Sequence, residues 1–211
     1  MFQKYFFICN YLLIILVGIV YFNKIKQSLP LRLFLIFLGY SLITEILGTY
    51  FGFFARINTA VIYNIWNLIN YLFYSLFFFL IIKNKLKRRI ITLLAVLFFG
   101  FELINTLFFQ DFLNEVFINN AILGYLLLAI IVILFFTELL NSDQIMRVQK
   151  SMFFWISLGV LLYSLVFIPV FIIGEFISYR GIYRYVTFGL NIIMAICFIT
   201  GFIVSKKEFN I

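Results

Sequence analysis

The sequence predicts an all-α integral membrane protein that folds as a seven-transmembrane helix bundle. Its 211 residues are 65% hydrophobic and only 11% charged, whereas soluble proteins are about half apolar and a quarter charged. Apolar runs of about twenty residues recur along the whole chain, and each can cross roughly 30 Å of hydrocarbon as a helix. Short polar segments separate these runs, which indicates helices joined by loops.

The predicted spans and their loops take up nearly all of the chain. The spans cover residues 5–22, 33–54, 62–82, 90–109, 117–139, 152–175 and 185–204. Polar segments such as NKIKQSLP at 23–30 and KNKLKRR at 83–89 separate them. We therefore expect a single transmembrane domain over residues 1–211, with no room for a soluble catalytic, nucleotide-binding or DNA-binding domain.

The basic residues orient the predicted bundle, because Lys and Arg near span ends are retained in the cytoplasm. One set of flanks holds twelve: Lys24, Lys26, Arg32, Lys83, Lys85, Lys87, Arg88, Arg89, Arg147, Lys150, Lys206 and Lys207. The other set holds four: Lys4, Arg56, Arg180 and Arg184. This difference predicts an outside N-terminus and a cytoplasmic C-terminus in a multi-pass protein of the cell (inner) membrane.

The loop of Lys83, Lys85, Lys87, Arg88 and Arg89 is the strongest single determinant. It is expected to anchor the topology and touch anionic headgroups of the lipid bilayer, or else to dock a partner protein. The net charge of +8 is thereby explained by topology, so we expect no nucleic acid partner.

The residue types present argue against the common catalytic and metal sites. The chain has no His and only two cysteines, Cys9 and Cys197, which the topology places in opposite halves of the bilayer. Zinc, haem and Ser-His-Asp constellations have no ligands or base here. We expect no metal, no cofactor, no disulfide and no enzyme activity.

Two carboxyl groups stand out, because an ionisable side chain at membrane depth costs at least about 2.5 kcal/mol. Glu45 and Glu102 lie near the middle of the second and fourth spans, with no Lys or Arg at comparable depth. We expect both to be protonated or exposed to water. Ser41, Glu45, Gly48 and Gly52 form one stripe of the second span, and this small and polar face is predicted to pack on protein.

Further polar side chains fall in the same half of the bilayer. The candidates for ligand binding or proton sensing are Glu45, Glu102, Asn64, Asn67, Asn105, Tyr71 and Asn191. If their faces converge, they form an outward-facing polar cavity. The alternative is that each one hydrogen-bonds a neighbouring helix as packing glue.

Two other features admit two interpretations each, and a third has one. Residues 45–51 align with 102–108 at an offset of 57, which indicates that spans two and three repeat as four and five, or arises by chance in a chain so rich in Phe, Leu and Ile. Pro169 should kink the sixth span, as a moving part or as static packing. Trp66, Trp155 and Tyr183 are typical of interfacial anchors.

Several segments resemble a group of seven-span bacterial membrane proteins that has no assigned activity. They are Glu45, the stretch Tyr63-Asn64-Ile-Trp-Asn67, and Phe154-Trp155-Ile-Ser-Leu-Gly159 followed by Tyr163. The chain departs from the group at Val166, where a small residue is frequent. The resemblance implies a sensory or regulatory membrane module, in some cases associated with histidine-kinase signalling.

Three functions are compatible with these patterns. The first is a receptor or sensor module whose outward cavity binds a small molecule, a lipid portion or a proton and which signals through a partner. The second is a small proton-coupled transporter or channel, which needs polar groups continuing to the cytoplasmic side. The third is a structural or effector subunit of a larger membrane complex.

Overall fold

The computed structural model describes residues 2–142, 145–177 and 180–210, with side chains for 5–142, 146–172 and 185–210. Within these ranges the regular structure is helical, without β-strands. Six of the helices are long and apolar enough to cross a membrane. The prediction of an all-α, multi-pass membrane protein is therefore confirmed.

The helices follow the predicted spans closely. They are α1 (Phe2–Val20), α2 (Leu29–Thr49), α3 (Ala60–Ile81), α4 (Lys85–Phe108), α5 (Ile118–Leu140), α6 (Met152–Ile177) and α7 (Arg180–Val204). A π-helical segment, Tyr50–Ala55, extends α2. The apolar part of α1, Tyr5–Val20, is shorter than the six spans, and a seventh crossing stays a prediction.

Local chemistry sets several helix ends. Pro30 occupies the first turn of α2, where its missing N–H would have no intrahelical partner. Asn84 caps α4, because its side-chain oxygen accepts hydrogen bonds from the amides of Leu86 and Lys87 at 2.9 and 3.2 Å. Pro169 lies inside α6, and the helix continues through it.

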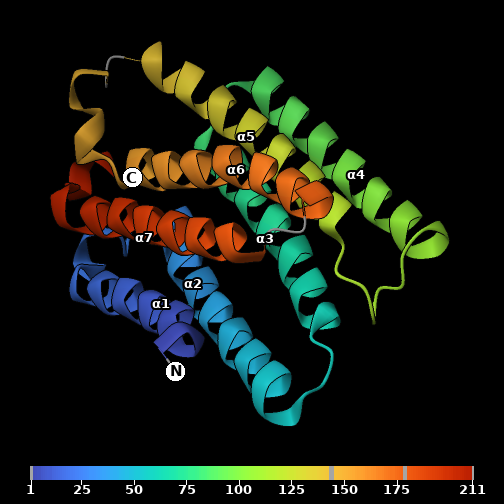
Figure 1. The fold of residues 1–211 in the computed structure, drawn as a ribbon. Coiled ribbons are helices and arrows are strands. Elements are labelled where there is room, and N and C mark those ends of the chain that lie inside the picture. The colour runs from blue at the N-terminus through green and yellow to red at the C-terminus, as the bar shows by residue number, and fades with distance from the viewer. Residues whose placement is uncertain (1, 143–144, 178–179, 211) are drawn as a thin grey trace.

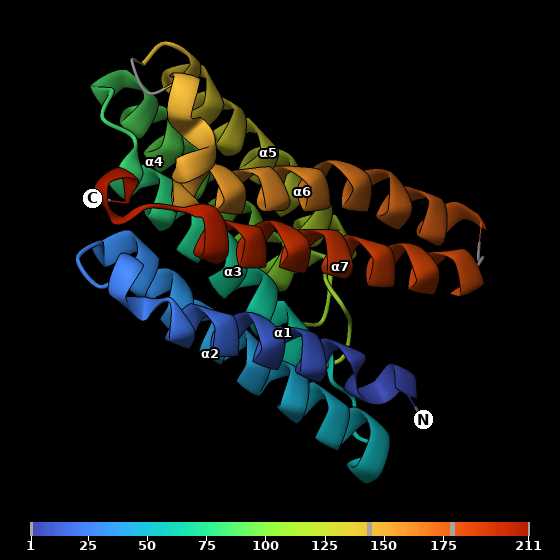
Figure 2. The same ribbon diagram turned by 90° about the vertical axis from the view of Figure 1, so that its left-hand side faces the viewer.

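Six helices form a closed ring, in which α1, α2, α3, α5, α6 and α7 pack on one another in that order and α7 returns to α1 (Figure 1). The remaining helix, α4, packs outside this ring against α3 and α5. The chain begins at one end of the bundle and finishes at the other (Figure 2). These are called the N-terminal end and the C-terminal end below.

The ring gives no equivalent places to α2 and α4, although residues 45–51 and 102–108 align. Helix α2 lies in the ring between α1 and α3, whereas α4 lies outside it. The packing instead relates α1–α3 to α5–α7. Within each set of three, the middle helix packs against the other two, and the two sets contact each other through α3 with α5 and through α7 with α1. The arrangement is that of two three-helix halves joined by α4.

Aromatic side chains fill the interior toward the C-terminal end. The ring of Phe34 lies edge-on to that of Phe198 at 5.0 Å between centroids and contacts Phe77 at 6.1 Å. All three are at most 1% exposed. Such a layer excludes water, since it offers no polar group to solvate.

The C-terminal segment is tied to the α1–α2 loop and to the start of α6 at the C-terminal end. The Lys24 ammonium donates to the carbonyls of Phe202 and Ile203 at 3.1 and 2.6 Å, as expected of a cation at a helix C-terminus. Asn210 accepts a hydrogen bond from the Met152 amide at 2.8 Å. Movement of α7 would therefore be transmitted to α6 and to the α1–α2 loop. Cys9 and Cys197 are both free, the first exposed and the second buried.

Candidate functional site

A cavity of about 450 Å³ lies among the six ring helices near the N-terminal end. This volume is typical of small-molecule sites, roughly 300–1,000 Å³. Val116 of the α4–α5 loop, one of its lining residues, is exposed. Its lining comprises Phe7, Tyr11, Glu45, Thr49, Tyr63, Trp66, Asn67, Val116, Tyr125, Tyr163, Phe167, Phe171, Thr187 and Asn191. We call it the Glu45 cavity.

The polar stripe of α2 places Glu45 in this cavity. Ser41 and Gly48 on that stripe are buried, and a Cβ atom at Gly48 would lie 2.5 Å from the Tyr63 hydroxyl oxygen. The glycine therefore lets Tyr63 of α3 approach the α2 backbone. The stripe faces protein as predicted, except at Gly52, which is exposed.

The Glu45 carboxyl has no partner among the side chains that the structure describes. Among the residues whose side chains are described, none donates a hydrogen bond to it or forms an ion pair with it. The hydroxyl groups of Tyr11 and Tyr63 are close enough to interact electrostatically with this carboxyl group. The part of the lining that the structure describes contains no Lys or Arg. A carboxyl group removed from water without a partner is costly, so Glu45 is a candidate to receive a charged or hydrogen-bonding group of a ligand.

Asn67 and Asn191 also line the cavity. The side-chain amide of Asn191 donates to the Thr187 carbonyl at 2.9 Å, and its backbone carbonyl accepts from Asn10 at 3.2 Å. Asn67 makes no hydrogen bond with any described group and reaches a second, small cavity beside Tyr71. Glu45 and Asn67 are thus two polar side chains of the lining without a hydrogen bond to another described group.

The other predicted site residues lie elsewhere. Glu102 of α4 is buried and accepts a hydrogen bond from Asn120 of α5, and Asn105 donates to Gln110 at 2.9 Å. Tyr71 packs on Phe98 with centroids 4.1 Å apart. The structure places neither Glu102 nor Asn105 in the Glu45 cavity, because α4 packs outside the ring.

Asn64 holds the α4–α5 loop. Its amide donates to the carbonyls of Phe112 and Glu115 at 2.9 and 2.8 Å, and its side-chain oxygen accepts from the Phe117 amide at 2.9 Å. Both N–H donors and the oxygen of this fully buried side chain thus bond to loop backbone. Asn64 therefore positions the loop that contributes Val116 to the lining of the cavity.

The aromatic wall is the part that the sequence analysis missed. Tyr125, Tyr163, Phe167 and Phe171 of α5 and α6 form one cluster, with Tyr163 and Phe167 stacked at 4.9 Å. With 31 Phe and 13 Tyr in the chain, no pattern distinguishes them from ordinary packing residues.

Trp66 is a correction to the predicted interfacial anchors. Its side chain lines the cavity, and the indole N–H donates to the Ser41 hydroxyl at 3.4 Å. Trp155 lies at the start of α6 and donates to the Gln149 carbonyl at 2.9 Å. The side chain of Tyr183 is outside the described residues.

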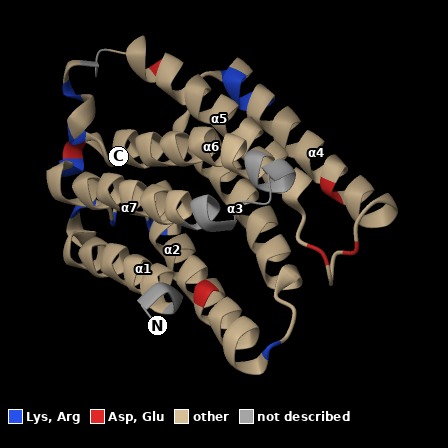
Figure 3. Ribbon diagram, viewed as in Figure 1, with Lys and Arg blue, Asp and Glu red and all other residues tan. Residues whose placement is uncertain are grey.

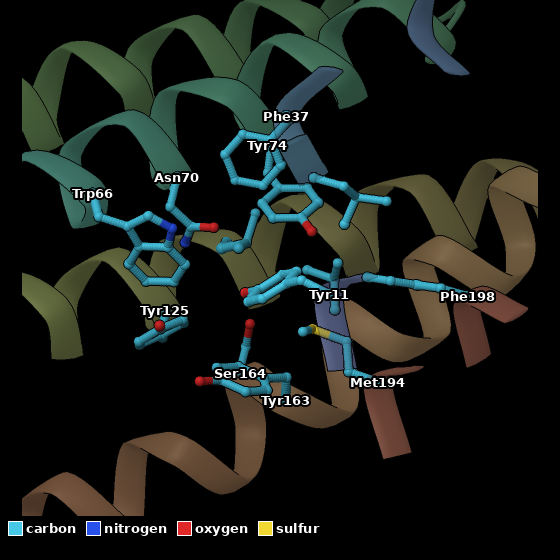
Figure 4. Close-up of a pocket in the computed structure, with 13 residues that line it drawn as sticks. Tyr11, Phe37, Trp66, Asn70, Tyr74, Tyr125, Tyr163, Ser164, Met194 and Phe198 are labelled. Atoms are coloured by element: carbon cyan, nitrogen blue, oxygen red, sulfur yellow. The ribbon is translucent and has the colours of Figure 1, made fainter. Parts of the chain in front are cut away.

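A narrow extension of about 30 Å³ lies next to the Glu45 cavity and shares Tyr11, Trp66, Tyr125 and Tyr163 with it. Figure 4 shows these rings around the space, with the Ser164 hydroxyl pointing into it. That hydroxyl is buried and has no hydrogen-bond partner among the described residues. The extension has room for a water molecule or two, and its lining reaches Phe198 of the aromatic layer.

The predicted basic loop lies at the C-terminal end, where Lys and Arg gather (Figure 3). Glu138 of α5 fixes it, accepting from the amides of Lys83 and Asn84 at 2.7 and 3.4 Å and pairing with Lys87 at 3.9 Å. Arg88 lies 4.3 Å from the centroid of the Phe79 ring. The remaining cations, Lys83, Lys85 and Arg89, are exposed and available to headgroups or a partner.

A second groove, of about 640 Å³, lies beside this loop and includes Lys83, Glu138, Glu208 and Phe209 in its lining. The Glu45 cavity and this groove occupy opposite ends of the bundle, with the aromatic layer between them. Among the described residues, no cluster of three or more His, Cys, Asp or Glu could hold a metal ion.

No model of a protein family, no curated protein and no solved structure matches the chain. The functional argument therefore depends on the geometry of the cavity.

Proposed function

We propose that the chain is a receptor or sensor module of the cell's inner membrane, which binds a small ligand in the Glu45 cavity from the outer side and signals through a partner at the cytoplasmic end. The observation that carries this proposal is the Glu45 carboxyl, which has no partner among the described side chains, in a cavity of ligand size. The charge distribution supports the direction, because the twelve basic residues of the predicted cytoplasmic flanks lie at the end opposite the cavity.

The bundle offers a route from ligand to partner. Asn191 of α7 lines the cavity, and the C-terminus of the same helix holds Lys24 through the carbonyls of Phe202 and Ile203. A ligand that shifts α7 would change this junction beside the 640 Å³ groove. The proposal requires such a shift to favour one of two arrangements of the C-terminal end.

Transport is a second candidate, favoured by one observation. The cavity lies between two halves, α1–α3 and α5–α7, whose helix contacts correspond. Two such halves can rock about a central site and expose it to either side in turn. Against this, the aromatic layer of Phe34, Phe77 and Phe198 closes the path toward the C-terminal end.

Cysteine accessibility separates the two candidates. Thr49 lines the cavity, and replacing both native cysteines with Ala allows Thr49→Cys to be the single thiol. A membrane-impermeant thiosulfonate should modify it in intact cells and leave it unmodified in inside-out vesicles. Modification from both sides would instead support transport, and no modification from either side would overturn the ligand cavity.

A further inference from the structure

The walls of the Glu45 cavity are aromatic to an unusual degree. Eight of its lining residues are Phe, Tyr or Trp: Phe7, Tyr11, Tyr63, Trp66, Tyr125, Tyr163, Phe167 and Phe171. They come from α1, α3, α5 and α6, so the rings surround the space from several sides. Figure 4 shows Tyr11, Trp66, Tyr125 and Tyr163 around its narrow extension.

Aromatic walls attract one class of ligand in particular. The face of each ring carries negative potential, so a cation within about 6 Å of the centroid is stabilised, most strongly where water is excluded. An anion meets the reverse potential over the same faces. A neutral apolar ligand would gain only from burial, and would leave the carboxyl group unsatisfied.

Glu45 supplies the matching charge. It is the one carboxyl group in the described lining, and no Lys, Arg or hydrogen-bond donor among the described side chains satisfies it. An organic cation would provide the missing partner while its alkyl groups fill the space between the rings. Asn67, without a hydrogen bond of its own, can bind a polar group of the same ligand.

We infer that the Glu45 cavity binds a small organic cation, an amine or alkylammonium compound, with its charge on Glu45 and its alkyl groups against the aromatic walls. This inference rests on the proposed function, because it names the ligand class of the same cavity. The cavity of about 450 Å³ accommodates a cation the size of choline or tetraethylammonium. The narrow extension, about 30 Å³, does not.

The fluorescence of Trp66 reports on occupancy, because this side chain lines the cavity. Trp155→Phe leaves Trp66 as the single tryptophan of a chain that has two. Choline and tetraethylammonium chlorides are titrated into this variant in nanodiscs, with sodium chloride as the salt control. We expect both organic cations to change the Trp66 emission saturably. The neutral isostere 3,3-dimethyl-1-butanol should bind at least about tenfold more weakly, a difference of about 1.4 kcal/mol.

Two variants of Glu45, made in the same Trp155→Phe background, test whether its carboxylate binds the cation. Glu45→Gln should weaken choline binding by about tenfold or more, whereas Glu45→Asp, which keeps the charge, should retain most of it. Glu102→Gln is the matched control, since it removes an intramembrane carboxyl group outside the cavity. Binding that is unchanged in Glu45→Gln would overturn the inference.

The outcomes also separate this inference from the proposed function. If the neutral isostere binds as tightly as choline, the cavity is a ligand site but the ligand class is wrong. If neither cation binds while Thr49→Cys reacts from outside, the cation inference fails and the receptor proposal stands. If Thr49→Cys is also unreactive, both fail.

Discussion

Asn64 holds the α4–α5 loop, which contributes Val116 to the lining of the Glu45 cavity. Its side chain makes three hydrogen bonds to the backbone at Phe112, Glu115 and Phe117, and it is fully buried. Replacing it with Ala should lower the free energy of unfolding by about 2–4 kcal/mol, because it leaves buried backbone groups unpaired. Thermal unfolding in detergent measures the loss.

Asn58 is the matched control for Asn64. It donates to the Asn114 carbonyl at 2.7 Å and accepts from the Ala60 amide at 2.9 Å, but its side chain is exposed. Water can replace the bond to the exposed Asn114, which leaves only the Ala60 amide without its partner, so Asn58→Ala should cost less than Asn64→Ala, about 1–2 kcal/mol. Equal losses for the two variants would mean that Asn64 does not hold the loop in the way its geometry indicates.

Asp111 gives the same loop a dependence on pH. It lies outside the spans, and hydrogen bonds from the Asn114 side chain and the Leu113 amide hold the pKa of its carboxyl below the ordinary value of 3.8. The ionised form therefore stabilises the folded loop above that value, and the stabilisation is lost as pH falls through the lower, folded pKa. Hydrogen exchange at Leu113 should quicken relative to a matched amide as the pH falls below about 3.8, and Asp111→Asn should weaken this dependence.

At the same scale, the sequence singled out Glu45 but not its surroundings. The cost of a carboxyl group in hydrocarbon identifies a costly residue from sequence alone, and the structure places Glu45 in a cavity. Glu102 is equally costly by its depth, yet its carboxyl group accepts a hydrogen bond from Asn120 of the neighbouring helix α5. Which helix packs against each carboxyl group is set by the tertiary structure. It cannot be predicted from the depth of the residue or from the periodicity of its helix.

The two glycines of helix α2, Gly39 and Gly48, should respond differently to replacement by Ala because only Gly48 is closely packed. A Cβ at Gly48 would lie 2.5 Å from the Tyr63 hydroxyl and 2.9 Å from its Cζ, whereas a Cβ at Gly39 would meet nothing within 4 Å. Gly48→Ala should destabilise the bundle by about 1–3 kcal/mol by overpacking, and Gly39→Ala should change stability by no more than about 1 kcal/mol.

Tyr63→Phe provides the test of mechanism for Gly48. It removes the hydroxyl that the new methyl group meets first, so the double variant Gly48→Ala/Tyr63→Phe should be less destabilised than the sum of the two single variants. Additive losses in thermal unfolding would show that Gly48 is needed for some reason other than the approach of Tyr63.

The helices themselves could be predicted well, since span length and apolar composition follow from the bilayer. The ends differ by a few residues: α4 begins at Lys85 where residue 90 was predicted, because Asn84 caps a helix whose first turn is basic and lies outside the apolar run. The order of helices around the ring could not be predicted. Residues 45–51 and 102–108 suggested that α2 and α4 are equivalent, and the packing of α4 outside the ring shows otherwise.

For the whole molecule, orientation connects the cavity to its function. Twelve basic residues flank the spans at the end that carries the C-terminus and four at the other, so the C-terminus should lie in the cytoplasm. A green fluorescent protein fused after residue 211 should fluoresce, and alkaline phosphatase fused there should be inactive. The same enzyme inserted in the α4–α5 loop should be active.

The basic loop allows this orientation to be challenged. Replacing Lys83, Lys85, Lys87, Arg88 and Arg89 with Gln leaves seven cytoplasmic charges, twelve less five, against four. The balance still favours the same direction but more weakly, so a minor fraction of the fusions should now report the inverted topology. An active phosphatase at the C-terminus of the unmodified chain would place the Glu45 cavity on the cytoplasmic side. Its ligand would then be an intracellular cation, and the basic loop would meet the outer surface instead of a cytoplasmic partner.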